Sequence, residues 1–201
     1  AEGRFADEMY LTQFVYEEAK HALAFRMWFD AVGVLEDLHE FTESNEAYTQ
    51  IFTRELPESL YALDGDPGPA NQIRASVTYN MIVEGVLAET GYQGYLTILE
   101  QRGILPGICR GVRLLRQDES RHIAYGVHLL SRLVAEGGPE VWQAVEERME
   151  ALLPPALGVV HEMFSPYDPI PFAVDPEQFL GFAMTQFQYR WSRIEKAGTD
   201  G

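Results

Sequence analysis

The chain has 201 residues, of which 46% are hydrophobic and 12% aromatic, so it can bury the core of one domain and is not a disordered chain. It contains 15 Lys and Arg but 31 Asp and Glu, and the resulting formal net charge of −16 argues against nucleic acid and anionic membranes as partners. No apolar stretch reaches the roughly 18 residues of a membrane span. The single cysteine, Cys109, excludes an intrachain disulfide, and we expect a cytoplasmic location.

Hydrophobic residues recur at helical spacing along the whole chain. We predict long helices over 4–32, 70–102, 106–136, 139–152 and 177–196. Glycines at 33, 103 and 137–138 mark the ends of the first three. Shorter helices interrupted by Pro57 are expected between 34 and 65, and a loop with four prolines over 165–176. The fourth helix either ends near 152 or continues after a kink at Pro154 and Pro155. The pattern predicts a single all-α domain over 1–201.

The first predicted helix carries apolar residues on two adjacent stripes, so we expect much of its surface to be buried. The second carries an acid, Glu84, inside the apolar segment 81–88. An ionised carboxylate is seldom buried unless it is paired, hydrogen-bonded or bound to a metal. Glu84 is therefore either a metal ligand or a residue of the one solvent-facing stripe of its helix.

The pattern Glu-x-x-His occurs three times, whereas a shuffled chain with five His and 22 Glu gives roughly half a match. The copies are Glu18 with His21, Glu36 with His39, and Glu119 with His122. Residues three apart on a helix project from the same side and can bind one ion. The first and third copies lie midway along long helices with apolar neighbours. The second lies in an acidic segment and is interpreted as a surface pair. For the other two, a core His beside a surface Glu is the alternative.

Two such pairs and a buried Glu on the helix between them make most of a dinuclear carboxylate site in a four-helix bundle. That architecture uses six protein ligands, and five are present: Glu18, His21, Glu84, Glu119 and His122. Carboxylate oxygens with one imidazole per ion suit iron or manganese.

Three segments resemble a known family: residues 15–21, residues 74–80 followed by Glu84, and residues 118–122. The chain resembles the ferritin-like superfamily branch that includes the ribonucleotide reductase small subunit. It is more similar to the related ligand-binding oxidases, which hold a manganese/iron site and a long-chain fatty acid. The resemblance implies a ferritin-like four-helix bundle core with extra helices, one Mn and one Fe with di-iron as the alternative, and a homodimer. It also implies an O2-activating oxidase that removes hydrogen from C–H bonds.

The resemblance also implies roles for residues around the ligands. In the ligand-binding oxidases a Tyr five residues before the Glu of the intermediate helix becomes ether-linked to a Val on a preceding helix. Tyr79 stands at that offset from Glu84, although five residues of an α-helix turn about 500° and place it off the face of Glu84. A packing tyrosine is the alternative. Asp118 matches the acid that holds a metal-binding His, here His21. Tyr92, eight residues after Glu84, is either a site residue or a core tyrosine.

Radical-bearing reductase subunits carry a Tyr four residues after the first metal-binding His, and Phe25 stands there. A tyrosyl radical at that position is therefore not expected. A reductase small subunit of the Mn/Fe type, a metal-binding bundle without oxidase activity and a purely structural helical protein remain as alternatives.

The family draws its sixth ligand and the Val of the ether link from a helix before the one that carries Glu18. Acids near the start of the chain, such as Glu8, lie about 15 Å along the same helix and are poor substitutes. Either the first core helix lies upstream of Ala1, which we expect, or the site is incomplete. A Glu followed three residues later by a Val upstream of Ala1 would decide between the two.

Overall fold

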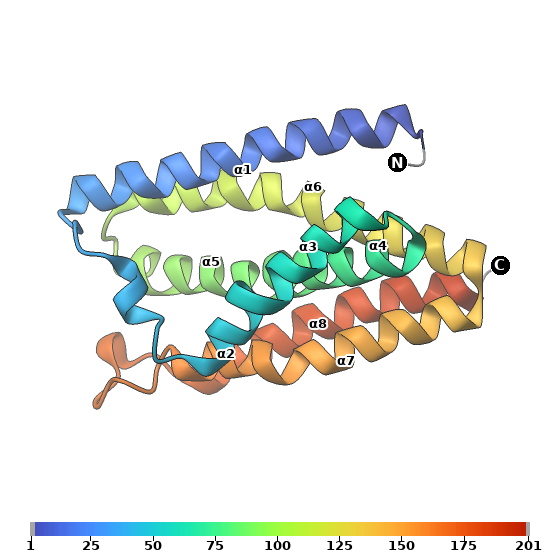
Figure 1. Cartoon of the computed structure of the whole chain (residues 1–201). Helices are drawn as coiled ribbons and strands as arrows, with labels where there is room; N and C mark the ends of the chain where they lie inside the picture. Colours follow the sequence, from blue (N-terminus) through green and yellow to red (C-terminus); the bar gives the residue numbers. More distant parts are fainter. Residues whose placement is uncertain (1–2, 200–201) are drawn as a thin grey trace.

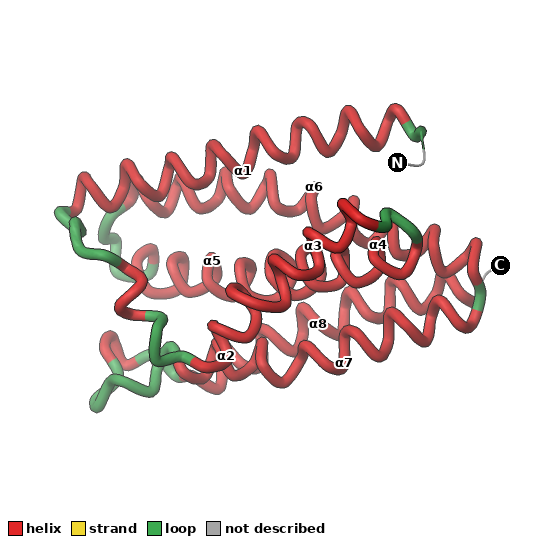
Figure 2. The backbone as a smooth tube through the Cα atoms, viewed as in Figure 1, coloured by secondary structure: helices red, strands yellow, loops and turns green. Residues whose placement is uncertain are grey.

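The computed structural model describes residues 3–199, and all regular elements in that range are helices (Figure 1, Figure 2). Four long helices are α1 (Phe5–Val32), α6 (Pro106–Gly137), α7 (Pro139–Glu162) and α8 (Pro176–Thr199). The predicted all-α fold is confirmed. The longer alternative for the helix at 139 is the one adopted, because α7 continues through Pro154 and Pro155 to Glu162.

The predicted helix over 70–102 is a continuous rod of residues 69–100, which we call the central helix. It changes its hydrogen bonding along its length, in four segments: α4 (Pro69–Ser76), η3 (Val77–Ala88), α5 (Glu89–Tyr95) and η4 (Leu96–Glu100). The segments η3 and η4 are π-helical, with hydrogen bonds between residues five apart. Periodicity predicted the helix but not this wider winding.

Residues 34–65 hold a short 3-10 turn, η1 (Leu38–Phe41), followed by a continuous helix over 46–65. That helix comprises α2 (Glu46–Tyr48), η2 (Thr49–Glu55) and α3 (Leu56–Gly65). The expected interruption at Pro57 is wrong. Hydrogen bonding changes from the π to the α pattern at this point, so the N–H that proline lacks falls in the first turn of α3. A 3-10 turn, η5 (Pro171–Ala173), lies within the predicted loop.

The main core lies where η3 packs between α6, α7 and α8. Met81, Ile82 and Val86 of η3 are fully buried there. No helix among residues 3–199 is both long enough and apolar enough to cross a membrane. The core therefore holds the central helix in place from three sides.

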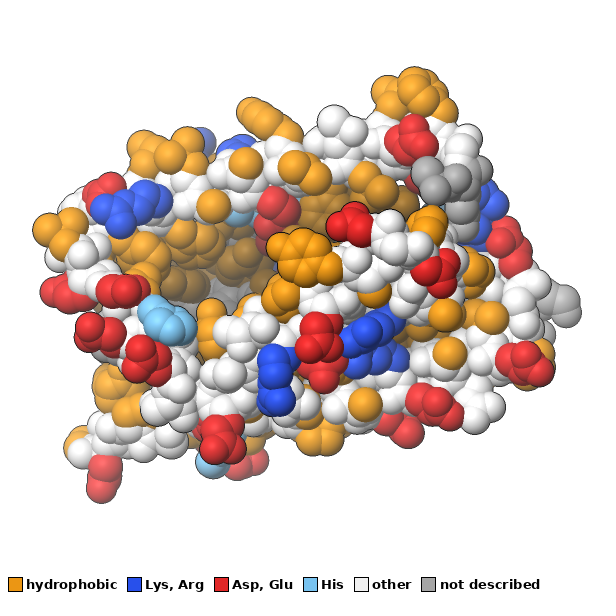
Figure 3. Space-filling model, viewed as in Figure 1, with side chains coloured by type: hydrophobic (Ala, Val, Ile, Leu, Met, Phe, Trp, Pro, Cys, Tyr) orange, Lys and Arg blue, Asp and Glu red, His pale blue; other side chains and the backbone are white. Residues whose placement is uncertain are grey.

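Helix α1 lies at the edge of the bundle and packs against α6 (Figure 1). The expectation that much of α1 is buried is wrong: Val15 and Tyr16 are 72% and 68% exposed, and its buried residues are Phe14, Glu17 and His21. Two apolar stripes were correctly located, but only one of them meets a neighbour. A hollow lined by hydrophobic side chains runs between α1 and α3 (Figure 3).

A glycine sets the distance between α6 and the central helix. A Cβ at Gly126 would lie 2.3 Å from the Cβ of Asn80, so the two backbones touch where the helices cross. Asn80 is the residue that hydrogen-bonds Glu84. The contact between α6 and η3 therefore fixes the position of Asn80 and, through its hydrogen bond, that of Glu84.

We predict that Gly126→Ala lowers the free energy of unfolding by about 1–3 kcal/mol, because the added methyl group must displace Asn80. Urea denaturation of the metal-free protein measures the change. Gly181→Ala in α8 is the matched control, since no atom lies within 4 Å of its added Cβ, and it should raise stability by about 0.5–1 kcal/mol. Equal effects of the two substitutions would contradict the prediction.

Candidate metal centre

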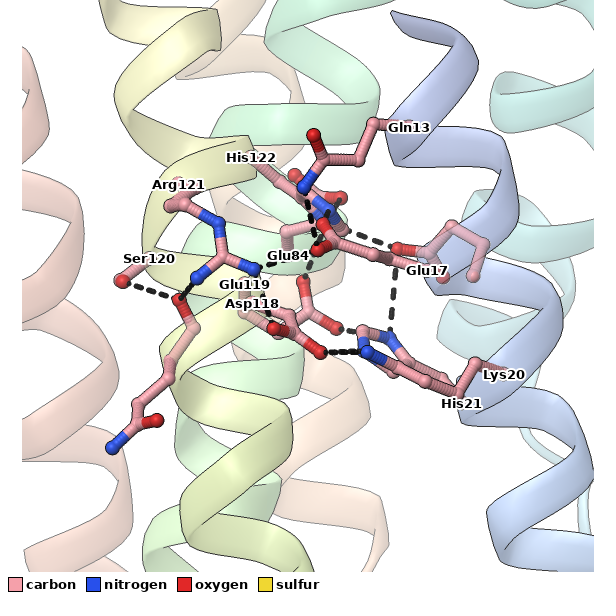
Figure 4. A network of polar contacts seen from close by, with 12 residues as sticks. Gln13, Glu17, Lys20, His21, Glu84, Asp118, Glu119, Ser120, Arg121 and His122 are labelled. Atoms are coloured by element: carbon pink, nitrogen blue, oxygen red, sulfur yellow. Dashed lines mark hydrogen bonds and ion pairs between the residues drawn. The ribbon is translucent and has the colours of Figure 1, made fainter. Parts of the chain in front are cut away.

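The structure brings all five predicted ligands together between three helices. Figure 4 labels four of them, His21, Glu84, Glu119 and His122. Helix α1 contributes Glu18 and His21, α6 contributes Glu119 and His122, and η3 contributes Glu84. One ligand atom from each of Glu18, Glu84, Glu119 and His122 lies within 4.8 Å of the others. The two Glu-x-x-His pairs thus face each other across the α1–α6 contact.

The two imidazoles point their Nδ1 atoms at the carboxylates. His122 Nδ1 lies 3.1 Å from Glu18 Oε1, 3.4 Å from Glu84 Oε1 and 3.6 Å from Glu119 Oε2. His21 Nδ1 lies 3.4 Å from Glu119 Oε1 and 3.7 Å from Glu18 Oε1. The carboxylates of Glu18 and Glu119 therefore lie between the two imidazoles.

One buried polar atom of each of these five residues has no hydrogen-bond partner, although the atoms lie close together. They are Glu18 Oε1, His21 Nδ1, Glu84 Oε1, Glu119 Oε2 and His122 Nδ1. Buried polar atoms are almost always hydrogen-bonded, so five unpartnered ligand atoms in one cluster indicate a binding site for metal cations. The donor set of three carboxylates and two imidazoles suits iron or manganese, so the residues fit the implied dinuclear centre.

The outer nitrogen of each imidazole contacts an acid from the opposite helix. His21 Nε2 of α1 lies 3.2 Å from Asp118 Oδ2 of α6, the pair that the resemblance implied. His122 Nε2 of α6 lies 2.8 Å from Glu17 Oε2 of α1. Such acids fix the ring orientation and make the other nitrogen a better metal ligand. The two crossed pairs turn both Nδ1 atoms toward the cluster.

The two outer acids are themselves held by cations and an amide. Arg121 Nη2 donates to Glu17 Oε1 at 2.6 Å and to Asp118 Oδ1 at 2.5 Å, and so joins the two crossed pairs. Lys20 Nζ donates to Asp118 Oδ2 at 2.6 Å, and Gln13 Nε2 to Glu17 Oε1 at 3.1 Å. Charge-assisted contacts of this kind hold the acids ionised and in place.

Two neutral side chains position the remaining carboxylates. Asn80 Nδ2 donates to Glu84 Oε2 at 2.9 Å, while Ser76 Oγ donates to Asn80 Oδ1 at 3.0 Å. The Tyr92 hydroxyl donates to Glu119 Oε1 at 3.0 Å, so Tyr92 is in contact with the cluster. Each of these two carboxylates therefore keeps one oxygen in a hydrogen bond and one oxygen free.

Without metal, protons compensate the charge of the cluster. Burial favours neutral imidazoles, but the facing carboxylates outweigh it and raise the pKa of His21 to about 10 and that of His122 to about 12. Burial also opposes ionisation of Glu18, yet His122 and His21 lower its pKa to about 2. At Glu84 burial prevails over His122 and Asn80, and the pKa rises to about 7.

The π-helical winding of η3 corrects the expected position of Tyr79. In an α-helix Tyr79 would point away from Glu84, but in a π-helix residues five apart are about one turn apart and share a face. Tyr79 lines the hollow beside Glu18, and its ring lies 5.5 Å from that of Phe14. Burial and the charges of Glu84 and Glu18 raise its pKa.

The structure leaves the third Glu-x-x-His copy at the surface. The His39 side chain is 64% exposed and its nearest acid is Glu43, at 4.0 Å. Its helix is the short 3-10 turn η1 rather than a long bundle helix.

Sequence reasoning missed Glu17 and Asn80. Both left a signal: Glu17 stands directly before a Glu-x-x-His, as Asp118 does, and Asn80 is a polar residue four positions before Glu84 in an apolar segment. Four residues is the helical spacing at which side chains meet.

The family model of the ribonucleotide reductase small chain matches residues 6–165, which include all five candidate ligands. The chain belongs to this small-chain family.

Solved structures place this family member near its oxidase branch. It is similar to the R2-like ligand-binding oxidase from Sulfolobus acidocaldarius, with 38% identity, a TM-score of 0.87, and coverage of 98% of this chain and 66% of that one. It is also similar to an R2-like ligand-binding oxidase without metal cofactor, with 32% identity, a TM-score of 0.90, and coverage of 96% of this chain and 73% of that one. A point mutant of an R2-like ligand-binding oxidase with anaerobically reconstituted Mn/Fe cofactor has 34% identity, a TM-score of 0.89, and coverage of 96% of this chain and 70% of that one. The chain spans about two thirds of the length of these proteins.

We predict that Glu17→Gln in this small-chain protein weakens Mn(II) or Fe(II) binding about tenfold or more, because His122 loses the charged partner that orients it. Metal titration against a competing chelator measures the affinity. Glu150→Gln on the exposed side of α7 removes the same charge away from the cluster and should leave affinity unchanged. Unchanged binding in Glu17→Gln would refute the role assigned to Glu17.

Metal binding should also release protons. The raised pKa values of His21 and His122 mean that both imidazoles are protonated at pH 7.5 in the metal-free protein, and both must lose a proton to become ligands. We expect release of about two protons when both ions bind, and affinity that rises between pH 7 and about 10. Calorimetry in buffers of different ionisation enthalpy measures the release, and a heat independent of buffer would contradict it.

Proposed function

We propose that the protein is an O2-dependent oxidase that holds one Mn and one Fe and oxidises C–H bonds, similar in function to the R2-like ligand-binding oxidases. The observation that carries this proposal is the set of five orphaned buried atoms, one from each candidate ligand. The matched oxidases with Mn/Fe cofactors support the choice of metals.

The residues divide into two groups around the proposed ions. His21 would bind one ion and His122 the other, with Glu84 on the side of His122. Glu119 lies between the two imidazoles and would contribute its unpartnered Oε2 on the side of His122, while Oε1 accepts the hydrogen bond from Tyr92. When bound, such a pair supplies the redox and Lewis-acid chemistry that O2 activation needs. The sixth ligand is proposed to come from a segment before Ala1, as expected from the ligand count.

The substrate is proposed to enter from the hollow between α1 and α3. This cavity has a volume of about 600 Å³, and Glu18 and Tyr79 line it. Most of its exposed lining is apolar, and charged residues of α1 and α6, such as Asp7, Glu8 and Arg132, complete it. The Glu18 side chain is 35% exposed, so the cluster is accessible from this side and closed by the core on the other. An apolar cavity of this size that ends at a metal site suits a long-chain fatty acid or a similar ligand.

Tyr79 is proposed as the residue that is itself oxidised. The phenol is protonated at neutral pH, and burial raises its pKa further, so the proposed route is removal of its hydrogen together with an electron. In the ether link implied by the resemblance, an O–C bond forms between Tyr79 and a Val while the Tyr79 O–H and the Val C–H break, which releases two electrons and two protons to O2. Two further electrons from the reduced Mn(II) and Fe(II) and two protons from solvent would complete the reduction of O2 to water. Phe25, which packs against Trp28 and Tyr95, has no hydroxyl and does not offer a second site of this kind.

The test is to load the full-length protein with Mn(II) and Fe(II) without oxygen and then to admit air. We expect both metals by X-ray fluorescence, an O2-dependent change in the optical spectrum, and a loss of about 2 Da from the peptide linked through Tyr79. Tyr79→Phe should keep the metals and the optical change but not the mass change. A protein that holds neither metal would overturn the proposal.

The surface copy of the motif supplies a matched control for the ligands. His122→Ala should abolish binding at its ion, because His122 is buried at the centre of the cluster. His39→Ala removes an equally spaced His from the surface and should leave metal content and the optical change intact. Equal metal loss in both variants would mean that the cluster is not the binding site.

A further inference from the structure

A second cavity is lined by none of the five candidate metal ligands. It has a volume of about 710 Å³ and is bounded by α6, α8 and the central helix. Four arginines line it, together with one acid, Glu89, in a chain whose acids outnumber its Lys and Arg two to one. We call it the arginine cavity, after Arg113, Arg116, Arg190 and Arg193.

Arg190 of α8 is the most unusual of the four, because it is only 6% exposed and forms no ion pair with a described carboxylate. Its Nη1 donates to the backbone and side-chain oxygens of Gln186 at 2.8 and 2.7 Å, while the buried Nε has no hydrogen-bond partner. Burial lowers the pKa of Arg190, and the charge of Glu89 only partly opposes this. A buried guanidinium without a counter-ion is costly unless an anion joins it.

The other arginines add positive charge near the opening. Arg116 pairs with Glu89 at 2.9 Å, and Arg113 pairs with Glu100. Arg193 lies over the ring of Tyr189, 5.9 Å from its centre, and donates to its hydroxyl. Arg193 therefore has no carboxylate partner among the described residues. The lining as a whole has four positive charges against one negative charge.

The rest of the lining is mixed, with Gln117 and Ser120 as polar residues beside an apolar wall. Leu96, Ile123 and Val127 face the cavity, and Ile123 is buried. The volume is typical of sites for small molecules, which combine apolar walls with a few charged groups that orient the ligand. Guanidinium groups match the planar fork of carboxylates and the oxygens of phosphates.

We propose that the arginine cavity binds a phosphate monoester of a small apolar group, with the phosphate at Arg190 and Arg193 and the apolar group against Leu96, Ile123 and Val127. A dianionic phosphate compensates the two unpaired guanidinium groups, whereas a carboxylate compensates one. None of the five candidate metal ligands lines this cavity, so the proposal does not depend on the proposed oxidase activity.

Titration of the metal-loaded protein with phenyl phosphate, followed by calorimetry, tests the proposal. We expect saturable binding at one site, at least about tenfold tighter than for benzoate, and none for phenol. Arg190→Met keeps the bulk of the side chain and should weaken binding about tenfold or more. Arg110→Met removes an exposed charge of α6 that does not line the cavity and should change binding little. Benzoate binding as tightly as phenyl phosphate would overturn the assignment to a phosphate.

A second variant and the metal-free protein complete the test. Arg193→Gln lies at an exposed position and tests the site even if Arg190→Met does not fold; it should also weaken binding several-fold. Metal-free protein should bind phenyl phosphate as tightly as the loaded protein. Binding that disappears with the metal and persists in Arg193→Gln would place the phosphate on the metal centre and refute the proposal.

Discussion

The crossed contacts between α1 and α6 are the interaction on which the metal centre depends. Helix α1 packs on α6 at the edge of the bundle, and within that contact each helix supplies the acid that orients the imidazole of the other. Arg121 ties both acids together. Because Nε2 of each imidazole is occupied in this way, Nδ1 of each is left for a metal. The same side chains thus join the helices and prepare the ligands.

Charge compensation gives this arrangement its chemical character. Glu18 and Glu119 are ionised next to two imidazoles, and the charge of the cluster without metal is balanced by protons on His21 and His122. Metal ions must replace these protons, so binding and protonation oppose each other. Exposed hydrophobic residues on α1 and the cavity beneath it are on the side of the cluster that remains open, next to Glu18.

The sequence predicted which residues gather in the cluster better than it predicted their surroundings. Helical spacing alone placed each Glu-x-x-His on one face, and the apolar neighbours of Glu84 indicated its burial. Glu17 was missed because its partner, His122, is on another helix and 105 positions away, a contact that no local pattern contains. The burial of α1 was overestimated because periodicity identifies which residues share a face but not whether a neighbour covers that face. Pro57 was misread because the change from π to α hydrogen bonding that accommodates it has no signature in composition.

The winding of η3 explains how one helix supplies so many parts of the site. With hydrogen bonds between residues five apart, Tyr79 and Glu84 share a face, and Asn80 lies beside them in reach of the Glu84 carboxylate. Such winding is rare because its hydrogen bonds are less favourable than those of an α-helix, and it is frequent at functional sites. Here the burial of Met81, Ile82 and Val86 against three other helices stabilises it. The apolar segment that first marked Glu84 as unusual is therefore also what holds the π-helix, and with it the phenol, in place.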